Sequence, residues 1–342
     1  MRLPLGKLNP QILQKRVINH IITDDSVLNP PAIGEDGAVF RTTQNIIVAA
    51  SDPITGEASN EKIGRLSVHV NANDIYVHAA SPRWYLATIL LPESEEEDTV
   101  GEIMEGIQKG INEVGANLIG GHTELTKKVN APILSGFMIG EPMVNSKFIR
   151  SAGGREDDRI LMTKGAGIEG TAILAHTFEN ELQLKPNLIT RAKKFEELLS
   201  VKSEVEILVK KVGIDHISSM HDATEGGVLG AVYELATASG IGFELWGDKI
   251  LVKDETRHIC RSMNVNPLKL ISSGTLLVAL PKNKVNKAVN TLNNQGIETA
   301  VIGKLTAKGK YLTVGRTRQR IKKAPLDEIW RIFSSPLDKG AR

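Results

Sequence analysis

A strand–helix–strand pattern in the second half is the feature that most constrains the fold of this chain. The apolar run Leu276–Leu280 has the length and composition of a buried strand. Pro281 follows it and favours a helix start, because its missing N–H would be unpaired in a first turn anyway. Apolar residues then recur at helical spacing, at Val285, Val289 and Leu292. Gly296 ends that helix and residues 298–301 return as a strand, so we expect an α/β or α+β fold.

Strand and helix signals also alternate along the first half. The predicted strands cover residues 46–50, 85–91, 117–119 and 133–139, and the predicted helices cover residues 17–22, 61–80 and 99–114. In the second half, residues 160–162 indicate a strand and residues 189–212 a charged helical region. The small, glycine-rich stretch 151–154 is typical of a crossing between domains. We therefore expect an N-terminal domain at 1–150 and a C-terminal domain at 151–342.

Composition excludes several classes of protein. A single cysteine, Cys260, allows no intramolecular disulfide and no cysteine zinc cluster, which favours a buried thiol in a reducing cytoplasm. The 42 basic and 40 acidic residues nearly balance, and aromatic residues are only 4%, which argues against a nucleic acid partner. No apolar run approaches the ~18–20 residues of a membrane span, and the N-terminus has no secretory pattern. The basic run at residues 316–323 is expected to be a solvated strand or loop.

One familiar phosphate-binding motif is present and weak. Gly165, Gly167 and Gly170 match G-x-G-x-x-G between a predicted strand and a helix. A dinucleotide site also needs a strand with an acidic residue about 20 positions later, and residues 184–187 do not have that pattern. We interpret the glycines as a strand-to-helix turn whose helix N-terminus can still hold an anion. The sequence contains no Walker A motif, zinc-protease helix or nucleophile elbow.

Carboxylates beside glycines and strand ends give the stronger signal. The positions in the first half are Glu35 and Asp36 in a tight turn, Asp52 after a strand, Asn73-Asp74 in a helix, and Gly120-Gly121-His122-Thr123-Glu124 after a strand. Carboxylate oxygens together with substrate phosphates are the ligands that Mg²⁺ prefers, and glycine lets backbone N–H groups approach phosphate. Lys7 either adds a positive charge to a phosphate or is a solvated lysine on a loose N-terminus.

A second acidic segment lies in the other half, at Asp222, Thr224 and Glu225. Asp222 or Thr224 can cap the helix whose apolar stripe is Val228, Val232 and Leu235. The same side chains can instead contact a substrate, and the sequence leaves both interpretations open.

The order of these segments resembles the aminoimidazole-ribonucleotide (AIR) synthetase superfamily, with HypE-like hydrogenase-maturation proteins the nearest in appearance. The segments are IGEDGAV, ASDPITG, GRLSVHVNANDIYVHAASPRW, LIGGHTEL, LMTKGAGIEGT and MHDATEGGVLGAVYELA, and the resemblance covers roughly residues 5–315. It implies a PurM-like N-terminal α/β domain that forms a barrel across a homodimer, followed by a PurM-like C-terminal α+β domain of ferredoxin-like character. It also implies ATP and Mg²⁺ as cofactors.

The resemblance assigns roles to matching positions. Glu35, Asp36, Asp52 and Asp74 are expected to bind metal and phosphate, with Asp36, Asp52 and Asp74 counted as catalytic. Lys7, Asn73, Gly120, Gly121, His122 and Thr123 are expected along the nucleotide, and Asp222, Thr224 and Glu225 near the substrate. The implied reaction phosphorylates a carbonyl or amide oxygen of an unknown small molecule or of a maturation partner. The alternatives are a small-molecule kinase resembling thiamine-monophosphate kinase and a nucleotide-binding regulator that has lost catalysis.

Three departures from the family pattern bear on the reaction. HypE proteins end in a cysteine that carries the dehydrated group, whereas the last eight residues printed here contain none. His122 stands where several relatives have an acid, which would leave a metal with one ligand fewer. The acidic turn contains Glu35 before Asp36 instead of two aspartates.

Overall fold

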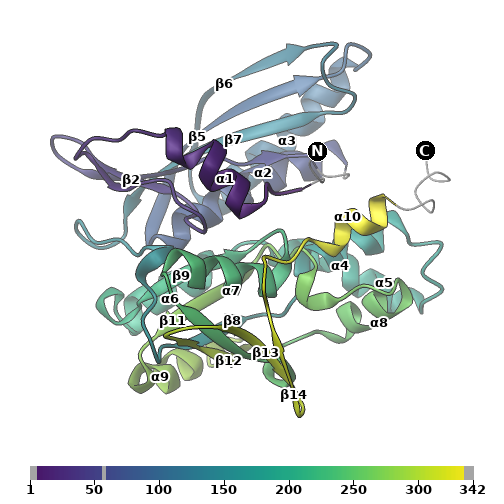
Figure 1. Cartoon of the computed structure of the whole chain (residues 1–342). Helices are drawn as coiled ribbons and strands as arrows, with labels where there is room; N and C mark the ends of the chain where they lie inside the picture. The colour runs from purple at the N-terminus through teal and green to yellow at the C-terminus, as the bar shows by residue number, and fades with distance from the viewer. Residues whose placement is uncertain (1–5, 56–58, 335–342) are drawn as a thin grey trace. The chain divides into compact units, whose positions relative to one another are not determined.

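The computed structural model describes residues 6–55 and 59–334, and the chain forms two compact units (Figure 1). The N-terminal unit comprises Thr23–Pro30 and Asp36–Phe148, and the C-terminal unit comprises Met1–Ile22, Pro31–Glu35 and Ile149–Arg342. The start of the chain therefore belongs to the unit that the second half builds. Among the described helices, none has the length and apolar character needed to cross a bilayer.

The N-terminal unit is a seven-stranded sheet with two long helices. Its strands are β1 (Val27–Asn29), β2 (Ala38–Arg41), β3 (Ile46–Ala50), β4 (Pro53–Ile54), β5 (Ala80–Leu91), β6 (Asn117–Leu125) and β7 (Ile133–Pro142), and its helices are α2 (Asn60–Val77) and α3 (Glu97–Val114). The strand order is β1-β2-β3-β7-β5-β6, with β4 paired to β7. β5 and β6 are parallel because α3 makes the crossover between them, and the other pairs are antiparallel.

Helix α2 packs on β5 and β7, and α3 packs on α2. The two helices approach through glycines. A Cβ atom added to Gly106 would lie 1.9 Å from the carbonyl oxygen of Glu61, and one added to Gly64 would lie 2.2 Å from that of Ile103. Side chains at these positions would separate the helices, so the glycines allow α3 to hold α2 on the sheet.

The C-terminal unit is a second seven-stranded sheet with helices. Its strands are β8 (Arg159–Thr163), β9 (Ser219–Ala223), β10 (Gly242–Trp246), β11 (Thr275–Leu280), β12 (Thr299–Thr306), β13 (Lys310–Val314) and β14 (Thr317–Arg320). Its α-helices are α1 (Pro10–Arg16), α4 (Ile168–Thr177), α5 (Pro186–Lys193), α6 (Lys202–Lys211), α7 (Gly227–Ala238), α8 (Asp254–Ser262), α9 (Lys282–Asn293) and α10 (Glu328–Phe333). Short 3₁₀ turns are η1 (Ile18–His20), η2 (Ser151–Gly153), η3 (Lys194–Leu198), η4 (Ile214–His216), η5 (Gly247–Lys249) and η6 (Pro267–Lys269).

The sequence-predicted strand–helix–strand unit is present as β11, α9 and β12. In the strand order β14-β13-β10-β12-β8-β11-β9, strand β8 lies between β11 and β12 and is antiparallel to both. The unit is therefore a split βαβ, the arrangement of ferredoxin-like domains. The core of this sheet packs against α7, whose buried residues include Val228, Val232 and Leu235.

Three local predictions were wrong. The first helix begins at Pro10 and ends at Arg16, because the Asn9 side chain caps it by accepting from the Gln11 N–H, and only η1 forms in the predicted 17–22 helix. The charged region 189–212 is broken into α5, η3 and α6. The glycine pair after residue 119 does not end the strand, since β6 continues through it to Leu125.

Other predictions on single segments are confirmed. Burial raises the pKa of the Cys260 thiol on α8 to about 12, as expected for a structural cysteine. The basic run contributes the exposed strand β14. Gly165 and Gly167 of the G-x-G-x-x-G motif lie in the turn between β8 and α4, with Gly167 left-handed at the N-cap, and Gly170 lies within α4. Helix α5 occupies the place where a dinucleotide fold needs a strand.

Candidate functional site

Helix α2 carries an unusual set of buried polar side chains. Ser67, His69, Asn71, Asn73 and Asp74 are all at most 5% exposed, although burying polar groups costs free energy unless they are hydrogen-bonded. Asn71, Asp74 and the C-cap residue His78 are spaced three and four residues apart, so they share one face of the helix. The contacts of this face show which segments of the N-terminal unit lie near Asp74.

Asn71 holds the backbone at Asp52. The Asp52 N–H donates to Asn71 Oδ1 at 2.8 Å, and Asn71 Nδ2 donates back to the Asp52 carbonyl oxygen at 3.3 Å. The Gly136 N–H on β7 donates to the same carbonyl at 3.0 Å. These bonds hold the peptide that follows β3 in place. The Asp52 side chain is half-buried.

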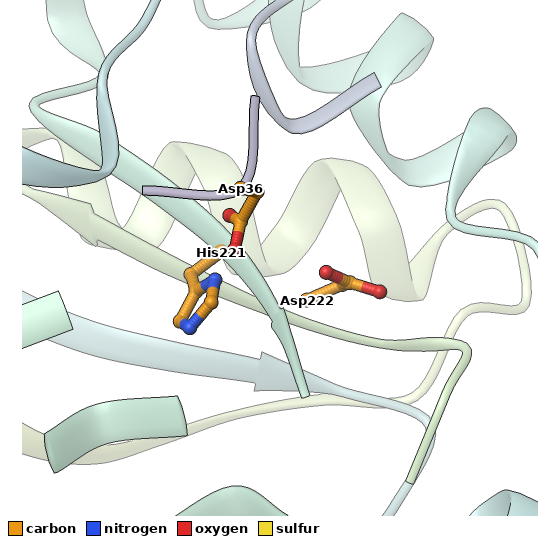
Figure 2. A group of neighbouring side chains, drawn as sticks. All are labelled: Asp36, His221 and Asp222. Carbon is orange, nitrogen blue, oxygen red and sulfur yellow. The ribbon is translucent and has the colours of Figure 1, made fainter. Parts of the chain in front are cut away.

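His78 lies beside the turn that contains Asp36, which is labelled in Figure 2. A Cβ atom built on Gly37 would be 3.1 Å from His78 Nε2, and Asn29 Nδ2 donates to the Gly37 carbonyl at 3.0 Å. One face of α2 therefore runs from the Asp52 peptide to the 36–37 turn, with Asp74 between its two ends. Within the N-terminal unit, the backbone at three of the acids predicted from the sequence therefore lies along one face of α2. These acids are Asp36, Asp52 and Asp74.

The glycine pair lies elsewhere on the sheet, on its terminal strand β6. The register pairs Gly121 with Ala87 of β5, and a Cβ at Gly121 would be 2.1 Å from the Ala87 carbonyl oxygen, so only glycine fits there. His122 and Thr123 are exposed, and His122 Nε2 lies 3.4 Å from Glu124 Oε2. Strands β5 and β7 separate this segment from β3, so the predicted role of these residues along a phosphate chain stays a prediction.

The acidic segment of the C-terminal unit lies at the end of β9 and the start of α7. The predicted capping role was wrong for both candidates. Asp222 lies within β9, and Gly226, in the left-handed conformation, is the N-cap of α7 with no side-chain cap. The carboxylate of Asp327 accepts from the Gly226 N–H at 2.6 Å instead. Thr224 and Glu225 are thereby left for other contacts.

Lys7 meets these two residues. Its Nζ donates to Thr224 Oγ1 at 3.2 Å, and its backbone N–H donates to Glu225 Oε1 at 2.8 Å. Trp330 Nε1 on α10 donates to the same Glu225 oxygen at 2.9 Å. The structure thus brings together a residue predicted on the nucleotide and two predicted on the substrate, although 200 and more positions separate them in sequence.

Glu234 completes this cluster and was missed by sequence reasoning. It lies 3.5 Å from Lys7 Nζ and 3.2 Å from His221 Nε2. Burial opposes ionisation, but the charge of Lys7 and the His221 hydrogen bond outweigh it and lower the pKa of Glu234 to about 2. The available signal was a single acid in the otherwise apolar helix α7.

Two further predicted residues have defined surroundings within the C-terminal unit. Both carboxylate oxygens of Glu35 accept backbone N–H groups, from Ser151 at 3.2 Å and Ala152 at 3.0 Å, so this side chain anchors η2. Its role as a metal ligand stays a prediction. Asp222 is buried beside His221 on β9, and a carboxylate oxygen and a ring nitrogen of the pair lie within 4.8 Å (Figure 2).

The fold defines a two-domain mixed α/β protein with PurM-like N- and C-terminal domains. The AIR synthase related protein N-terminal domain matches residues 34–141, and the AIR synthase related protein C-terminal domain matches residues 155–315. The chain belongs to the AIR synthase related family.

Curated relatives cover most of the chain at modest identity. A protein described as a hydrogenase expression/formation protein of Methanocaldococcus jannaschii is 28% identical over 85% of this chain and 82% of its own length. The carbamoyl dehydratase HypE of Rhizobium leguminosarum is 23% identical over 90% of this chain and 84% of its own. The thiamine-monophosphate kinase of Pyrococcus horikoshii is 24% identical over 82% and 85%.

Solved structures of HypE share the fold. A chain of a HypE–HypF complex superposes with a TM-score of 0.76 at 19% identity, covering 91% of this chain and 99% of that one. HypE in complex with ATP superposes with a TM-score of 0.70 at 20% identity, covering 94% and 97%.

Proposed function

We propose that this protein is an ATP- and Mg²⁺-dependent enzyme that phosphorylates a carbonyl or amide oxygen and releases ADP. The acceptor is a small molecule or the carboxamide of a maturation partner. The support comes from relatives that are dehydratases and kinases, and from a HypE structure that holds ATP.

The observation that carries the proposal is the α2 face in the N-terminal unit. Asn71 holds the peptide of Asp52, His78 lies beside Gly37, and Asp74 lies between them on the same face. Oxygen donors of this kind suit Mg²⁺, so Asp36, Asp52 and Asp74 would hold the ion. A bound Mg²⁺ would neutralise phosphate charge.

The bond changes are those of phosphoryl transfer. A substrate oxygen attacks the γ-phosphorus, the bond from that phosphorus to the β,γ-bridging oxygen breaks, and ADP leaves with the bridging oxygen. Asn73, Gly120, Gly121, His122 and Thr123 are assigned to the nucleotide. Asp222, Thr224 and Glu225 are assigned to the substrate. Lys7 is assigned to the nucleotide, and its contacts with Thr224 and Glu225 would bring a cation and acceptors to the same place.

The test compares Asp52→Asn and Asp74→Asn with Asp98→Asn, an exposed acid on α3. The two site variants should lose at least about 100-fold in Mg²⁺-dependent ADP release, because an amide keeps the shape but not the charge that a dication needs. Asp98→Asn should retain it. Circular dichroism verifies that all three fold. Full activity in both site variants would show that the metal assignment is wrong.

A kinase is the second candidate, favoured by the thiamine-monophosphate kinase relative. It would leave a stable phosphorylated product, whereas a dehydratase-type enzyme would release inorganic phosphate. Product analysis with γ-labelled ATP separates the two. ATP binding without ADP release, in a screen of small carbonyl and amide compounds, would favour the non-catalytic regulator.

We further propose that the protein is a homodimer through the N-terminal unit. β6 ends the sheet in the described part of the chain, and its residues 119–125 are exposed. Large apolar side chains on this edge and on β7 face solvent, namely Ile119, Leu125 and Phe137. Open strand edges with apolar residues favour pairing with another chain. Light scattering of the wild type should give twice the chain mass, and Ile119→Lys with Leu125→Lys should give the mass of one chain.

A further inference from the structure

A cavity of about 840 Å³ in the C-terminal unit is lined by none of the residues assigned to nucleotide, metal or substrate. Its walls come from β14, the segment 321–327 that follows it, η6 and α10. The volume is in the range of ligand pockets and far exceeds a single phosphate ion. The basic run that the proposed function leaves unused forms one wall.

The charges on this cavity are unbalanced. Lys269, Arg320, Lys322 and Lys323 line it, and none of them has a carboxylate within ion-pair distance in the part of the chain that the structure describes. The two acids in the lining are already engaged. Glu328 pairs with Arg331 at 2.9 Å, and Asp327 accepts from the Gly226 and Ile329 N–H groups. The cavity therefore presents four uncompensated cations.

Large apolar side chains form another part of the lining. Leu229, Leu312, Ile321, Pro325 and Trp330 contribute to it, and Leu326 beside them is 61% exposed. β14 ends its sheet, so one edge of this strand has no partner strand among the described residues. An extended peptide can pair with such an edge while its side chains use the pockets beside it.

We propose that this cavity binds an acidic, partly apolar segment of a partner polypeptide. Charge complementarity selects acidic residues, and the apolar wall selects interspersed large side chains. The last eight residues of the chain do not fit this description, because Asp338, Lys339 and Arg342 give them a net positive charge. The proposal is independent of the enzymatic reaction.

The test uses the full-length protein and a fluorescein-labelled peptide of alternating glutamate and leucine. The double variant K322E/K323E should weaken binding at least about tenfold, because two attractive charges become repulsive. The matched control K282E/K287E makes the same charge change on exposed positions of α9, outside the cavity, and should bind as the wild type does. Thermal melts show whether both variants fold.

Four results of the peptide experiments would overturn the proposal, and a change of mass in light scattering would be a fifth. The first is wild-type protein that does not bind the peptide, and the second is equal binding of a peptide with glutamine in place of glutamate. The third is equal weakening by K282E/K287E, which would make the effect one of net charge. The fourth is displacement of the peptide by low-millimolar inorganic phosphate at constant ionic strength, which would make the cavity a small-anion site. Unchanged mass of K322E/K323E in light scattering supports a foreign partner, whereas a change would assign the cavity to a second copy.

Discussion

Helices α2 and α7 both pack on a sheet beside predicted site residues, but they do so with opposite chemistry. α2 buries Ser67, His69, Asn71, Asn73 and Asp74, whereas the buried residues of α7 are glycine, alanine, valine and leucine. α7 therefore contributes mainly core, with Glu234 as its one acid, and the other polar groups near it come from the preceding turn, from His221 and from Lys7. α2 contributes polar groups from the helix itself.

The N-terminal unit places polar functional groups on a buried helix face, and this placement lowers what the helix contributes to stability. A buried polar helix face gains little stability from the hydrophobic effect. Other contacts must therefore keep such a helix packed on its sheet. In α2 those contacts are the close crossing with α3 at Gly64 and Gly106. In α7 apolar packing suffices. Substitutions in the core of α7 should therefore mainly lower stability, whereas substitutions of the polar residues of α2 should mainly impair ATP binding.

The largest effect is expected at the crossing of α2 and α3. Gly106→Ala should lower the free energy of unfolding by about 4 kcal/mol, because its Cβ would meet the Glu61 carbonyl at 1.9 Å. Gly101→Ala, on the same helix with nothing within 4 Å of the added atom, should raise it by up to about 1 kcal/mol. Urea denaturation measures both. Equal stability of the two variants would contradict the close-crossing argument.

The next effect is expected in the core of α7. Leu235→Ala should cost about 3 kcal/mol, because Leu235 is fully buried and its removal leaves a cavity. Mg²⁺-dependent ATP binding below the melting temperature should stay unchanged. Asp74→Asn on α2 is the counterpart, with ATP binding lost and the melting temperature retained. If Leu235→Ala impaired binding as much as Asp74→Asn, the contrast between the helices would fail.

A pH-dependent effect is expected from Asp327, the acid that holds the start of α7. Burial raises the pKa of Asp327 to about 7, above its unfolded value near 3.8. Its contribution to stability is therefore present in full below about pH 4 and is lost as the pH rises through 7. Asp327→Asn does not titrate, so the stability of the wild type relative to the variant should fall from pH 4 to pH 8. Thermal melts across that range test it, and a constant difference would contradict it.

The smallest effect is expected at Lys7. Lys7→Met should lower stability by less than about 1 kcal/mol, because the pair with Glu234 is half exposed on the lysine side. Half-molar salt should reduce the difference, since it screens the charge. Lys15→Met on α1 is the control and should have no effect in either buffer. A salt-independent loss at Lys7 would indicate lost packing in place of a lost ion pair.

Sequence alone determined the features that depend on local pattern. The strand of residues 46–50 and the helices near 61–80 and 99–114 followed from apolar periodicity, which each segment carries by itself. The ordered motifs were enough to predict the PurM-like domains and the family. The acids at positions 36, 52 and 74 could be selected as candidates because each stands beside a glycine, at a strand end or within a polar stretch of helix.

Only the tertiary structure decided which residues meet. The hydrogen bond from the Gly226 N–H to Asp327, the contacts of Lys7 with Thr224 and Glu225, and the pairing of Glu234 with His221 join positions that no local pattern relates. Gly121 fits inside β6 because the carbonyl oxygen of Ala87 on the neighbouring strand β5 leaves no room for a side chain. That requirement comes from β5 and is not visible in the sequence of β6. Partners across the fold depend on how the elements pack together, which the spacing of residues along one element does not encode.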